Sequence, residues 1–521
     1  MKRISKIVVK GFKRFENITL TLNDELSVLI GENEVGKSTI LEAIDLALNP
    51  NFYNYGDGVL ARAINNNIIK NFFEIKEIES LPKIEIELFL NIQSHPRVAD
   101  FDGLHYSSNN NGTLKTGIRF SYEFDEQFTD IVDLEEFANN KVLPTEYYSM
   151  TWKTFQGMTY KKAMAPIKMI YIDNSKVKKD IYGSYSRKIF KANLSKEEQR
   201  KLFSNFKAGL AKFKDQHVDN LKIEENQFIG FDESKTEFLK LIDIYDGDIS
   251  LQEMGSGQEN LIKTKLALSD DTFDLVIIDE PENHLSFTNT RKLVDLVSQI
   301  TGSQIVLATH SSLIVNRLNI KNTIWLSEIN SYSLKSLSNE TALYFEKIDN
   351  YDILRYILAK KVILVEGAAE YIMVPDIYKL ITNCSIDEDQ IEIISMGSIS
   401  YKRFKEISDT GILNKKTLVF TDNDGELSNF DENEVFQILT DQDTENWTLE
   451  VAFYNSNRQF FDDLYKDKGT ESTYKNVKYP KALAHMLKNK TDNALEVEKA
   501  VKNKNLTIPN YIEEGIRWIK R

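Results

Sequence analysis

The stretch Gly31-Glu32-Asn33-Glu34-Val35-Gly36-Lys37-Ser38-Thr39 decides the first half of the fold, because it fits the pattern G-x-x-x-x-G-K-[ST] at every fixed position. A strand predicted at 27–30 precedes it, and a helix predicted at 38–48 follows it. Strand, glycine-containing loop and helix form the context in which this motif binds phosphate. A chance match in a chain of this size is on the order of one per cent. The sequence therefore predicts a nucleotide-binding P-loop.

The residue types of this loop each suit one part of a bound nucleotide. The glycines allow backbone N–H groups to close around the phosphates. Lys37 is expected to reach the β- and γ-phosphates, and the Ser38 hydroxyl is expected to bind Mg²⁺. The predicted ATP-binding residues of the loop are Gly31, Asn33, Glu34, Gly36, Lys37, Ser38 and Thr39.

A second part of the same site is predicted where the apolar strand 275–278 ends in Asp279-Glu280-Pro281. An aspartate at the end of a buried strand can hold magnesium through water. The next residue, Glu280, is placed to polarise the attacking water as a general base. The alternative is an ordinary acidic turn after a strand, and the upstream P-loop favours the functional interpretation.

Composition limits the classes of protein to which the chain can belong. At 521 residues it is long enough for two or three domains, and 41% hydrophobic with 28% charged residues is the balance of a folded globular protein. The longest apolar runs fall far short of the roughly 18 residues of a membrane span, which excludes a transporter. Lys10 and Lys13 interrupt the N-terminal apolar stretch, so no signal peptide is predicted. The single cysteine, Cys384, fits a reducing cytoplasm, and no membrane partner is expected.

The net charge of −14 means that the overall field does not attract nucleic acid, so any DNA contact must come from local basic patches. Two basic runs are candidates, and the alternative for both is a solvated helix face. The first contains Lys176, Lys178, Lys179, Arg187, Lys188 and Lys191, interleaved with Tyr182, Tyr185 and Phe190; the second contains Lys475, Lys478, Lys481, Lys488 and Lys490.

Several further motifs resemble those of ABC-type ATPases. Gly255-Ser256-Gly257-Gln258 resembles their signature loop, Asn283-His284-Leu285 the loop that links two active sites, and Thr309-His310-Ser311 the γ-phosphate-sensing histidine. The segment 10–15 and the wide gap between P-loop and signature resemble DNA-repair ATPases of the RecF and Rad50 type. The resemblance implies that two subunits engage head to head around ATP, with Ser256, Gly257 and Gln258 of one closing on the nucleotide of the other.

Carboxylates follow two further predicted strands in the last third of the chain. Strand 362–365 leads into Glu366, and Glu370 lies four residues on, which is the same face of a helix. Strand 418–420 leads into Asp422 and Asp424, which point the same way if the segment is extended. Hard oxygen ligands without His or Cys indicate Mg²⁺ or Mn²⁺, which would also relieve carboxylate repulsion. A calcium loop or an ordinary acidic turn is the alternative.

This pattern, with the strand at 391–394 and the turn Gly397-Ser398 between, resembles the Toprim fold of topoisomerases, primases and certain nucleases. Toprim behind an ABC-type head resembles OLD-family (overcoming lysogenization defect) nucleases, and the ending at 508–518 looks like that family's closing segment. Gly397-Ser398 departs from the paired glycines that relatives often have. The family's phosphate-steadying lysine best matches Lys490, with Lys488 as the rival.

The resemblance implies an α/β protein with an ABC-type P-loop ATPase domain at 1–345, interrupted by a helical insertion at about 130–240, and a Toprim domain at 352–521. It implies an ATP-regulated, metal-dependent DNA endonuclease or nickase acting in anti-phage defence. The cofactors would be ATP and Mg²⁺ or Mn²⁺. The partners would be DNA, a second or further even number of copies, and a helicase or reverse transcriptase.

Two alternatives stay open. One is a Rad50- or RecF-like DNA-binding ATPase whose Toprim domain is non-catalytic, and the other is a toxin-like subunit that a partner silences. The motifs do not determine whether ATP activates or inhibits cleavage, the DNA preference, nick or double-strand cut, or the oligomer size.

Overall fold

The computed structural model describes residues 2–50, 57–106, 112–174, 184–217, 222–224, 227–228, 237–269, 273–327, 330–347, 353–397, 400–468, 472–503 and 505–521. The chain forms two compact units, Met1–Lys335 and Ser336–Arg521, each with its own hydrophobic core. The division falls about ten residues earlier than the sequence-predicted boundary at 345–352. The reason is helix α10 (Asn339–Lys347), whose Glu340 and Thr341 contact Arg403 and Glu406 of the second unit.

The centre of the first unit is a six-stranded sheet in the order β16-β15-β3-β14-β13-β8. Its strands are β3 (Leu26–Ile30), β8 (Met169–Asp173), β13 (Leu275–Asp279), β14 (Gln304–Ala308), β15 (Thr323–Leu326) and β16 (Ser331–Ser333). All pairs are parallel except β15 with β16. β13 and β14 are buried along their whole length, which explains their continuous apolar sequences.

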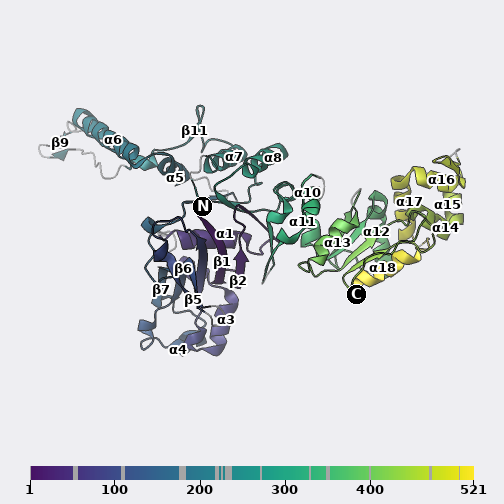
Figure 1. Ribbon diagram of the computed structural model, residues 1–521, viewed down its shortest axis with the longest axis horizontal. Coiled ribbons are helices and arrows are strands. Elements are labelled where there is room, and N and C mark those ends of the chain that lie inside the picture. The colour runs from purple at the N-terminus through teal and green to yellow at the C-terminus, as the bar shows by residue number, and fades with distance from the viewer. Residues whose placement is uncertain are drawn as a thin grey trace. The chain divides into compact units, whose positions relative to one another are not determined.

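A second sheet of the first unit is antiparallel, in the order β2-β1-β4-β6-β5 with β7 also paired to β6. Its strands are β1 (Arg3–Phe12), β2 (Phe15–Thr21), β4 (Ile84–Asn91), β5 (Asp102–Tyr106), β6 (Gly112–Phe124) and β7 (Tyr148–Thr154). Helix α1 (Lys37–Leu48) contacts β1, β4 and β6 of this sheet and β13 and β14 of the central one (Figure 1). The Gln304 amide also joins the sheets through the backbone of Ile4, with both distances 2.8 Å.

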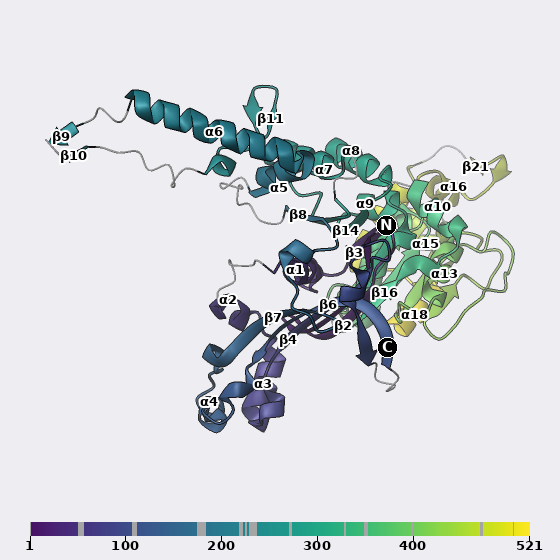
Figure 2. The same ribbon diagram turned by 60° about the vertical axis from the view of Figure 1, so that its left-hand side comes forward.

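The predicted helical insertion at about 130–240 is helical only in part. Strand β7 belongs to the antiparallel sheet and β8 is the edge strand of the central sheet, so 148–173 is part of the ATPase core. The helical part consists of α5 (Ser184–Asn193) and the long α6 (Lys196–His217), which Figure 2 shows running on from α5. The polar composition around these strands hid them from the sequence analysis, because only alternate residues of β8 are buried.

Shorter elements complete the first unit. They are α2 (Asp57–Arg62), α3 (Asn66–Ile75), α4 (Leu134–Asn139), α7 (Ser256–Ala267), α8 (Phe287–Ser298), α9 (Ser312–Arg317), and the two-stranded pairs β9 (Lys222–Glu224) with β10 (Gln227–Phe228) and β11 (Tyr245–Asp246) with β12 (Ile249–Ser250). Of the first basic run, Lys176, Lys178, Lys179 and Tyr182 lie outside the described residues.

The second unit is built on a four-stranded parallel sheet in the order β18-β17-β19-β20. The strands are β17 (Lys361–Val365), β18 (Ile391–Ser395), β19 (Thr417–Phe420) and β20 (Phe436–Leu439), so the three strands predicted here are confirmed. Helix α12 (Ala368–Thr382) contacts β18, α17 (Lys490–Lys502) and α18 (Asn510–Lys520). The parallel arrangement places the carboxyl ends of β17 and β19 at one edge of the sheet.

The remaining elements of the second unit are α11 (Ile353–Leu358), α13 (Tyr401–Asp409), α14 (Leu449–Ser456), α15 (Arg458–Leu464), α16 (Lys481–Lys488) and the hairpin β21 (Thr473–Tyr474) with β22 (Val477–Lys478). Gly397 has a positive φ of 57°, as expected for a turn, and Ser398 lies outside the described residues. In the ranges given above, none of the helices of either unit has the length and apolarity needed to cross a bilayer.

Candidate functional site

The P-loop connects β3 to α1, and its glycines have no room for a side chain. Gly36 precedes the first residue of α1 with a φ of 105°, and a Cβ there would lie 2.4 Å from Cζ of Phe15. A Cβ on Gly31 would lie 2.5 Å from Cγ1 of Val35 and 2.8 Å from the carbonyl oxygen of Leu326. Both positions therefore require glycine.

Lys37 folds back over the loop, where its Nζ donates to the carbonyl oxygens of Gly31 at 3.0 Å and Glu32 at 3.1 Å. Its residue is only 5% exposed, and burial lowers the pKa of the ammonium although Glu280, Asp279 and Glu282 oppose that shift. Asn33 and Glu34 are exposed on the loop, Ser38 is half-buried and Thr39 is buried. The only bonds that hold Lys37 are to backbone carbonyls, which a phosphate can replace.

Asp279, the last residue of β13, lies next to the P-loop serine. Its carboxylate is hydrogen-bonded to Ser38 and accepts a bond of 3.4 Å from the Tyr171 hydroxyl at Oδ2. Burial raises the pKa of Asp279 to about 6, and the charges of Asp173 and Glu280 add to the shift. Oδ1 is buried and has no hydrogen-bond partner among the described residues. A carboxylate oxygen without a partner beside a serine hydroxyl fits a magnesium site.

Glu280 and His310, which the sequence placed 30 residues apart, come together in the structure. His310 Nε2 lies 3.2 Å from Glu280 Oε1, and the backbone N–H of Glu280 donates to the Ala308 carbonyl at 2.9 Å. A third acid, Glu282, accepts from the Thr309 hydroxyl and from the His310 N–H, both at 2.7 Å. The sequence analysis missed Glu282, although its place two residues after Glu280 was an available signal.

The predicted signature loop forms the start of α7 and packs on the loop predicted to link active sites. A Cβ on Gly257 would lie 2.4 Å from the His284 carbonyl oxygen, and the Asn260 side chain donates to the Asn283 carbonyl at 3.1 Å. Ser256 and Gln258 are exposed in the first turn. Within the described residues, no hydrogen bond or ion pair joins Ser256, Gly257 or Gln258 to the P-loop of the same chain.

In the second unit, Glu366 and Glu370 lie at the carboxyl end of β17. Glu366 Oε1 accepts from the backbone N–H of Asp422 at 3.0 Å and from the Thr421 hydroxyl, which connects the ends of β17 and β19. Glu370, in the first turn of α12, accepts at Oε2 from the Gly367 N–H at 3.0 Å. These bonds leave the remaining oxygens of both carboxylates available to a ligand.

Asp422 is the electrostatic centre of this cluster. Burial raises its pKa to about 8, the charges of Glu366, Glu370 and Glu450 add to the shift, and Lys490 opposes it. Its Oδ1 accepts from the Leu449 N–H at 3.0 Å, at the start of α14. Burial also raises the pKa of Glu370, with Glu450 and Glu366 contributing. Carboxylates that raise one another's pKa in this way share one site.

The structure adds Glu450, which the sequence analysis missed, and brings Lys490 to it. Glu450 is buried, its Oε2 lies 2.9 Å from Lys490 Nζ, and the same oxygen accepts from the Thr448 hydroxyl at 2.6 Å. Burial opposes the charge on Lys490, but Glu450, Asp422 and Glu370 outweigh it and raise the pKa. An acid inside the apolar stretch 449–453 was the one available signal for Glu450.

Asp424 does not lie as the sequence predicted. The i, i+2 argument assumes an extended backbone, whereas Asp424 has a φ of 51°, is exposed, and donates its N–H to the Trp447 carbonyl at 3.2 Å. The turn is held by Asn423, whose side chain donates to the Asp441 and Asp443 carbonyls at 2.8 and 3.0 Å. Across the described residues, no three His, Cys, Asp or Glu side chains form a ready metal cage. The donor set of the cluster nevertheless has the chemistry that a hard divalent cation requires.

Comparison with known proteins now gives the family. Residues 1–315, more than half of the chain, match the family model of an AAA ATPase domain. The chain belongs to the AAA ATPase domain family. Residues 357–424 match the model "Overcoming lysogenization defect protein-like, TOPRIM domain". This AAA-family ATPase therefore carries an OLD-like TOPRIM domain, and the predicted fold class and family resemblance are confirmed.

Individual relatives of this AAA-family ATPase are distant. A protein of Helicobacter pylori (strain ATCC 700392 / 26695) described as an ATP/GTP phosphatase is 20% identical over 340 residues, which cover 61% of this chain and 87% of that protein. The SMC head bound to the C-winged helix domain of ScpA is 15% identical, covers 64% of this chain and 98% of its own, and has a TM-score of 0.35. The C-terminal region of the Burkholderia pseudomallei OLD protein is 15% identical, covers 31% of this chain and 97% of its own, and has a TM-score of 0.21.

Proposed function

We propose that this protein is an ATP-regulated, divalent-metal-dependent DNA endonuclease or nickase of the OLD type. One observation carries the proposal: Asp422, Glu366, Glu370 and Glu450 interact at the carboxyl edge of the second unit's sheet, with Lys490 beside them. A buried group of carboxylates next to a lysine suits metal-assisted attack on a phosphodiester, since phosphate, cation and lysine balance the negative charge.

In this proposal each residue of the cluster has a stated task. Glu366, Glu370 and Asp422 would hold Mg²⁺ or Mn²⁺, Glu450 would join them, and Asp424 at the exposed turn would complete the set on the substrate side. A bound divalent cation supplies Lewis-acid stabilisation of the attacking and leaving oxygens. Lys490, held by Glu450 at 2.9 Å, would present its ammonium to the scissile phosphate.

In the first unit, the proposed ATP site uses the contacts already described. Lys37 would exchange its two carbonyl partners for the β- and γ-phosphates, and Ser38 with Asp279 would hold Mg²⁺. Glu280 would orient the attacking water, and His310, 3.2 Å away, would sense the γ-phosphate. Ser256, Gly257 and Gln258, which begin α7, would close on the nucleotide of a second copy, which makes the active form a homodimer or a higher even-numbered oligomer.

The biological setting belongs to the same proposal and rests on the OLD-like TOPRIM match alone. It is anti-phage defence in the cytoplasm, with DNA as substrate and a helicase or reverse transcriptase as a further partner.

The test is incubation of purified protein with supercoiled plasmid and Mg²⁺ or Mn²⁺, with and without ATP, beside two variants. Asp422→Ala removes the centre of the cluster. Asp463→Ala, at an exposed position of α15 in the same unit, is the matched control. We expect nicking or linearisation by the wild type and by Asp463→Ala, and none by Asp422→Ala. The lanes with ATP give the direction of regulation.

Two results would contradict the proposal. Cleavage that persists in Asp422→Ala would show that the cluster is not the nuclease site. Absence of cleavage by the wild type with either metal, with or without ATP, would favour a TOPRIM domain that is not catalytic in the isolated protein.

A further inference from the structure

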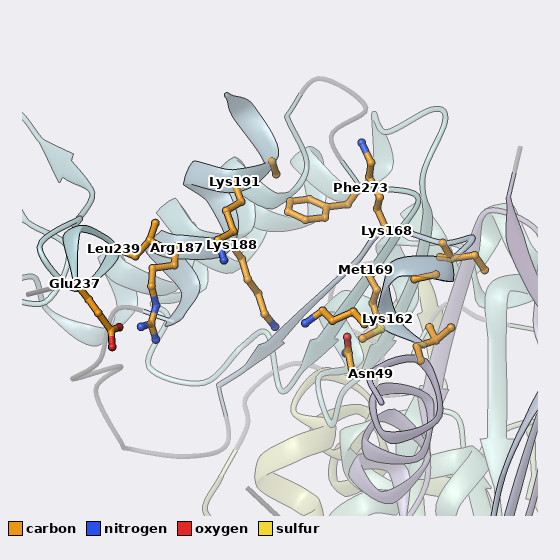
Figure 3. A pocket seen from close by; sticks show the side chains of 14 residues that line it. Asn49, Lys162, Lys168, Met169, Arg187, Lys188, Lys191, Glu237, Leu239 and Phe273 are labelled. Carbon is orange, nitrogen blue, oxygen red and sulfur yellow. The ribbon is translucent and has the colours of Figure 1, made fainter. Parts of the chain in front are cut away.

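A cationic pocket lies in the first unit, between the end of α1, the segment 162–169 that leads into β8, and α5; we call it the α5 pocket (Figure 3). Its volume is about 590 Å³. None of the P-loop residues 31–39 lines it, so it is separate from the proposed ATP site. Leu48, Ile167 and Phe273 are buried and form apolar parts of its wall.

Positive charge dominates the rim of the α5 pocket. Five basic side chains line it, namely Lys162, Lys168, Arg187, Lys188 and Lys191. Within the described part of the chain none of the five makes an ion pair. The one acid in the lining, Glu237, is paired with Lys240 at 3.3 Å. In a chain of net charge −14, such a concentration of unneutralised cations around one hollow indicates an anionic ligand.

The cations come from two facing walls. Figure 3 shows the side chains of Lys188, from α5, and Lys162, from the opposite wall, extending toward each other. Like charges that converge repel each other, and an anion between them relieves that repulsion. The nearby acid, Asp45, is buried behind them and is bonded to the Asn49 side chain at 2.5 Å, so it does not fill the gap.

The geometry points to the α5 pocket as a binding site for the phosphate backbone of DNA, outside both the ATP site and the carboxylate cluster. Cations on two walls suit a row of phosphates better than one compact anion, because a row presents charge to both walls at once. The inference rests on the proposed function only in taking DNA as the ligand. Arg187, Lys188 and Lys191 of the first basic run thereby gain partners from outside that run, Lys162 and Lys168.

The same elements connect the α5 pocket to the ATP site within the first unit. Helix α1 begins at Lys37 in the P-loop and ends at Leu48 in the pocket wall. Strand β8 begins at Met169 in the pocket and carries Tyr171, which is bonded to Asp279. DNA bound in the pocket would therefore contact the two elements that also carry ATP-site residues.

The test measures binding of a fluorescein-labelled DNA duplex to the full chain by anisotropy, in EDTA so that no metal-dependent cleavage occurs. The double variant Lys162→Gln/Lys188→Gln removes the converging charges. The control Lys70→Gln/Lys115→Gln removes the same charge from exposed positions of the same unit. Each lost phosphate contact forfeits about 0.9 counterion, a factor of about 8 at 0.1 M salt, so we expect about 50-fold weaker binding and a salt slope reduced by about 2. The control variant should bind as the wild type does.

Three results would overturn the inference. The first is a pocket variant whose affinity and salt slope equal those of the control. The second is a wild type that does not bind the duplex. The third is a pocket variant that binds DNA normally but loses inorganic tripolyphosphate, which would assign a small polyphosphate instead. The plasmid assay stays independent: loss of DNA binding in the pocket variant, with no Asp422-dependent cleavage, would support the pocket and refute the nuclease.

Discussion

Replacing Asp422 by asparagine should stabilise the metal-free second unit at high pH. The buried carboxyl has a pKa of about 8, against an ordinary value of 3.8, because burial and the charges of Glu366, Glu370 and Glu450 disfavour ionisation. Between about pH 4 and pH 8 the folded state therefore binds a proton that the unfolded state has released. Folding stability contributed by this group falls as the pH rises through that window. Asparagine cannot ionise, and its amide oxygen can still accept from the Leu449 N–H.

The magnitude follows from the two pKa values. At about 1.4 kcal/mol per pH unit, the difference between about 8 and 3.8 sets a ceiling of about 6 kcal/mol for the gain at pH 8. Half of that ceiling corresponds to a rise in melting temperature of about 10 °C for a unit of this size. Near pH 4 the wild-type aspartate is protonated in the folded state, so the gain should nearly vanish.

The assay is scanning calorimetry of the full chain in EDTA at pH 5 and pH 8, with native-state hydrogen exchange to assign transitions to each unit. Asp424→Asn is the control, because it removes the same charge from an exposed side chain two residues away. Adding Mg²⁺ at pH 8 should stabilise the wild type and leave Asp422→Asn nearly unchanged, since the cation offsets the repulsion that the variant lacks. The reasoning would be refuted if Asp422→Asn melted no higher than Asp424→Asn at pH 8, or if its advantage were the same at both pH values.

Three further predictions concern the first unit. Glu280→Gln should lower kcat for ATP hydrolysis by about 10²- to 10⁴-fold, as expected for loss of a general base, while fluorescent-nucleotide binding changes less than about threefold. Gly36→Ala should weaken ATP binding at least about tenfold in calorimetry, because a φ of 105° and the Phe15 ring at 2.4 Å leave no room for the methyl group. Arg119→Met should destabilise the unit by about 2 kcal/mol in urea unfolding, because it removes two hydrogen bonds of 2.8 and 2.6 Å from the buried Glu87 carboxylate. Unchanged urea midpoints for Arg119→Met would contradict this last prediction.

The parts of the fold that the sequence predicted are those encoded by adjacent residues. The P-loop is one continuous segment between an apolar strand and a helix, and strands such as β13 are apolar at every position because they are buried on both faces. β7 and β8 were not predicted, since they are partly exposed and surrounded by polar sequence. The domain boundary was placed late because the packing partner of α10, and not its own sequence, assigns it to the second unit.

The parts of the candidate sites that could not be predicted depend on contacts between distant residues. Glu450 joins Asp422 and Lys490 only because α14 and α17 lie against the same sheet edge. Conversely, Asp424 was expected beside Asp422 on the assumption of an extended backbone, and the Asn423 hydrogen bonds turn the chain instead. Spacing arguments therefore hold inside one regular element and fail where a side chain redirects the backbone.

The repulsion within the carboxylate cluster separates the two main interpretations of the second unit. A scaffold gains nothing from burying Asp422 among Glu366, Glu370 and Glu450, because each of these charges disfavours the ionised form of its neighbours. An enzyme that binds cations there gains affinity from the same repulsion, since the cation stabilises the folded state by the energy that the empty site lacks. A stability deficit at Asp422 that Mg²⁺ reverses is thus the thermodynamic signature of a working metal site, and a TOPRIM domain kept only as a scaffold has no physical reason to show it.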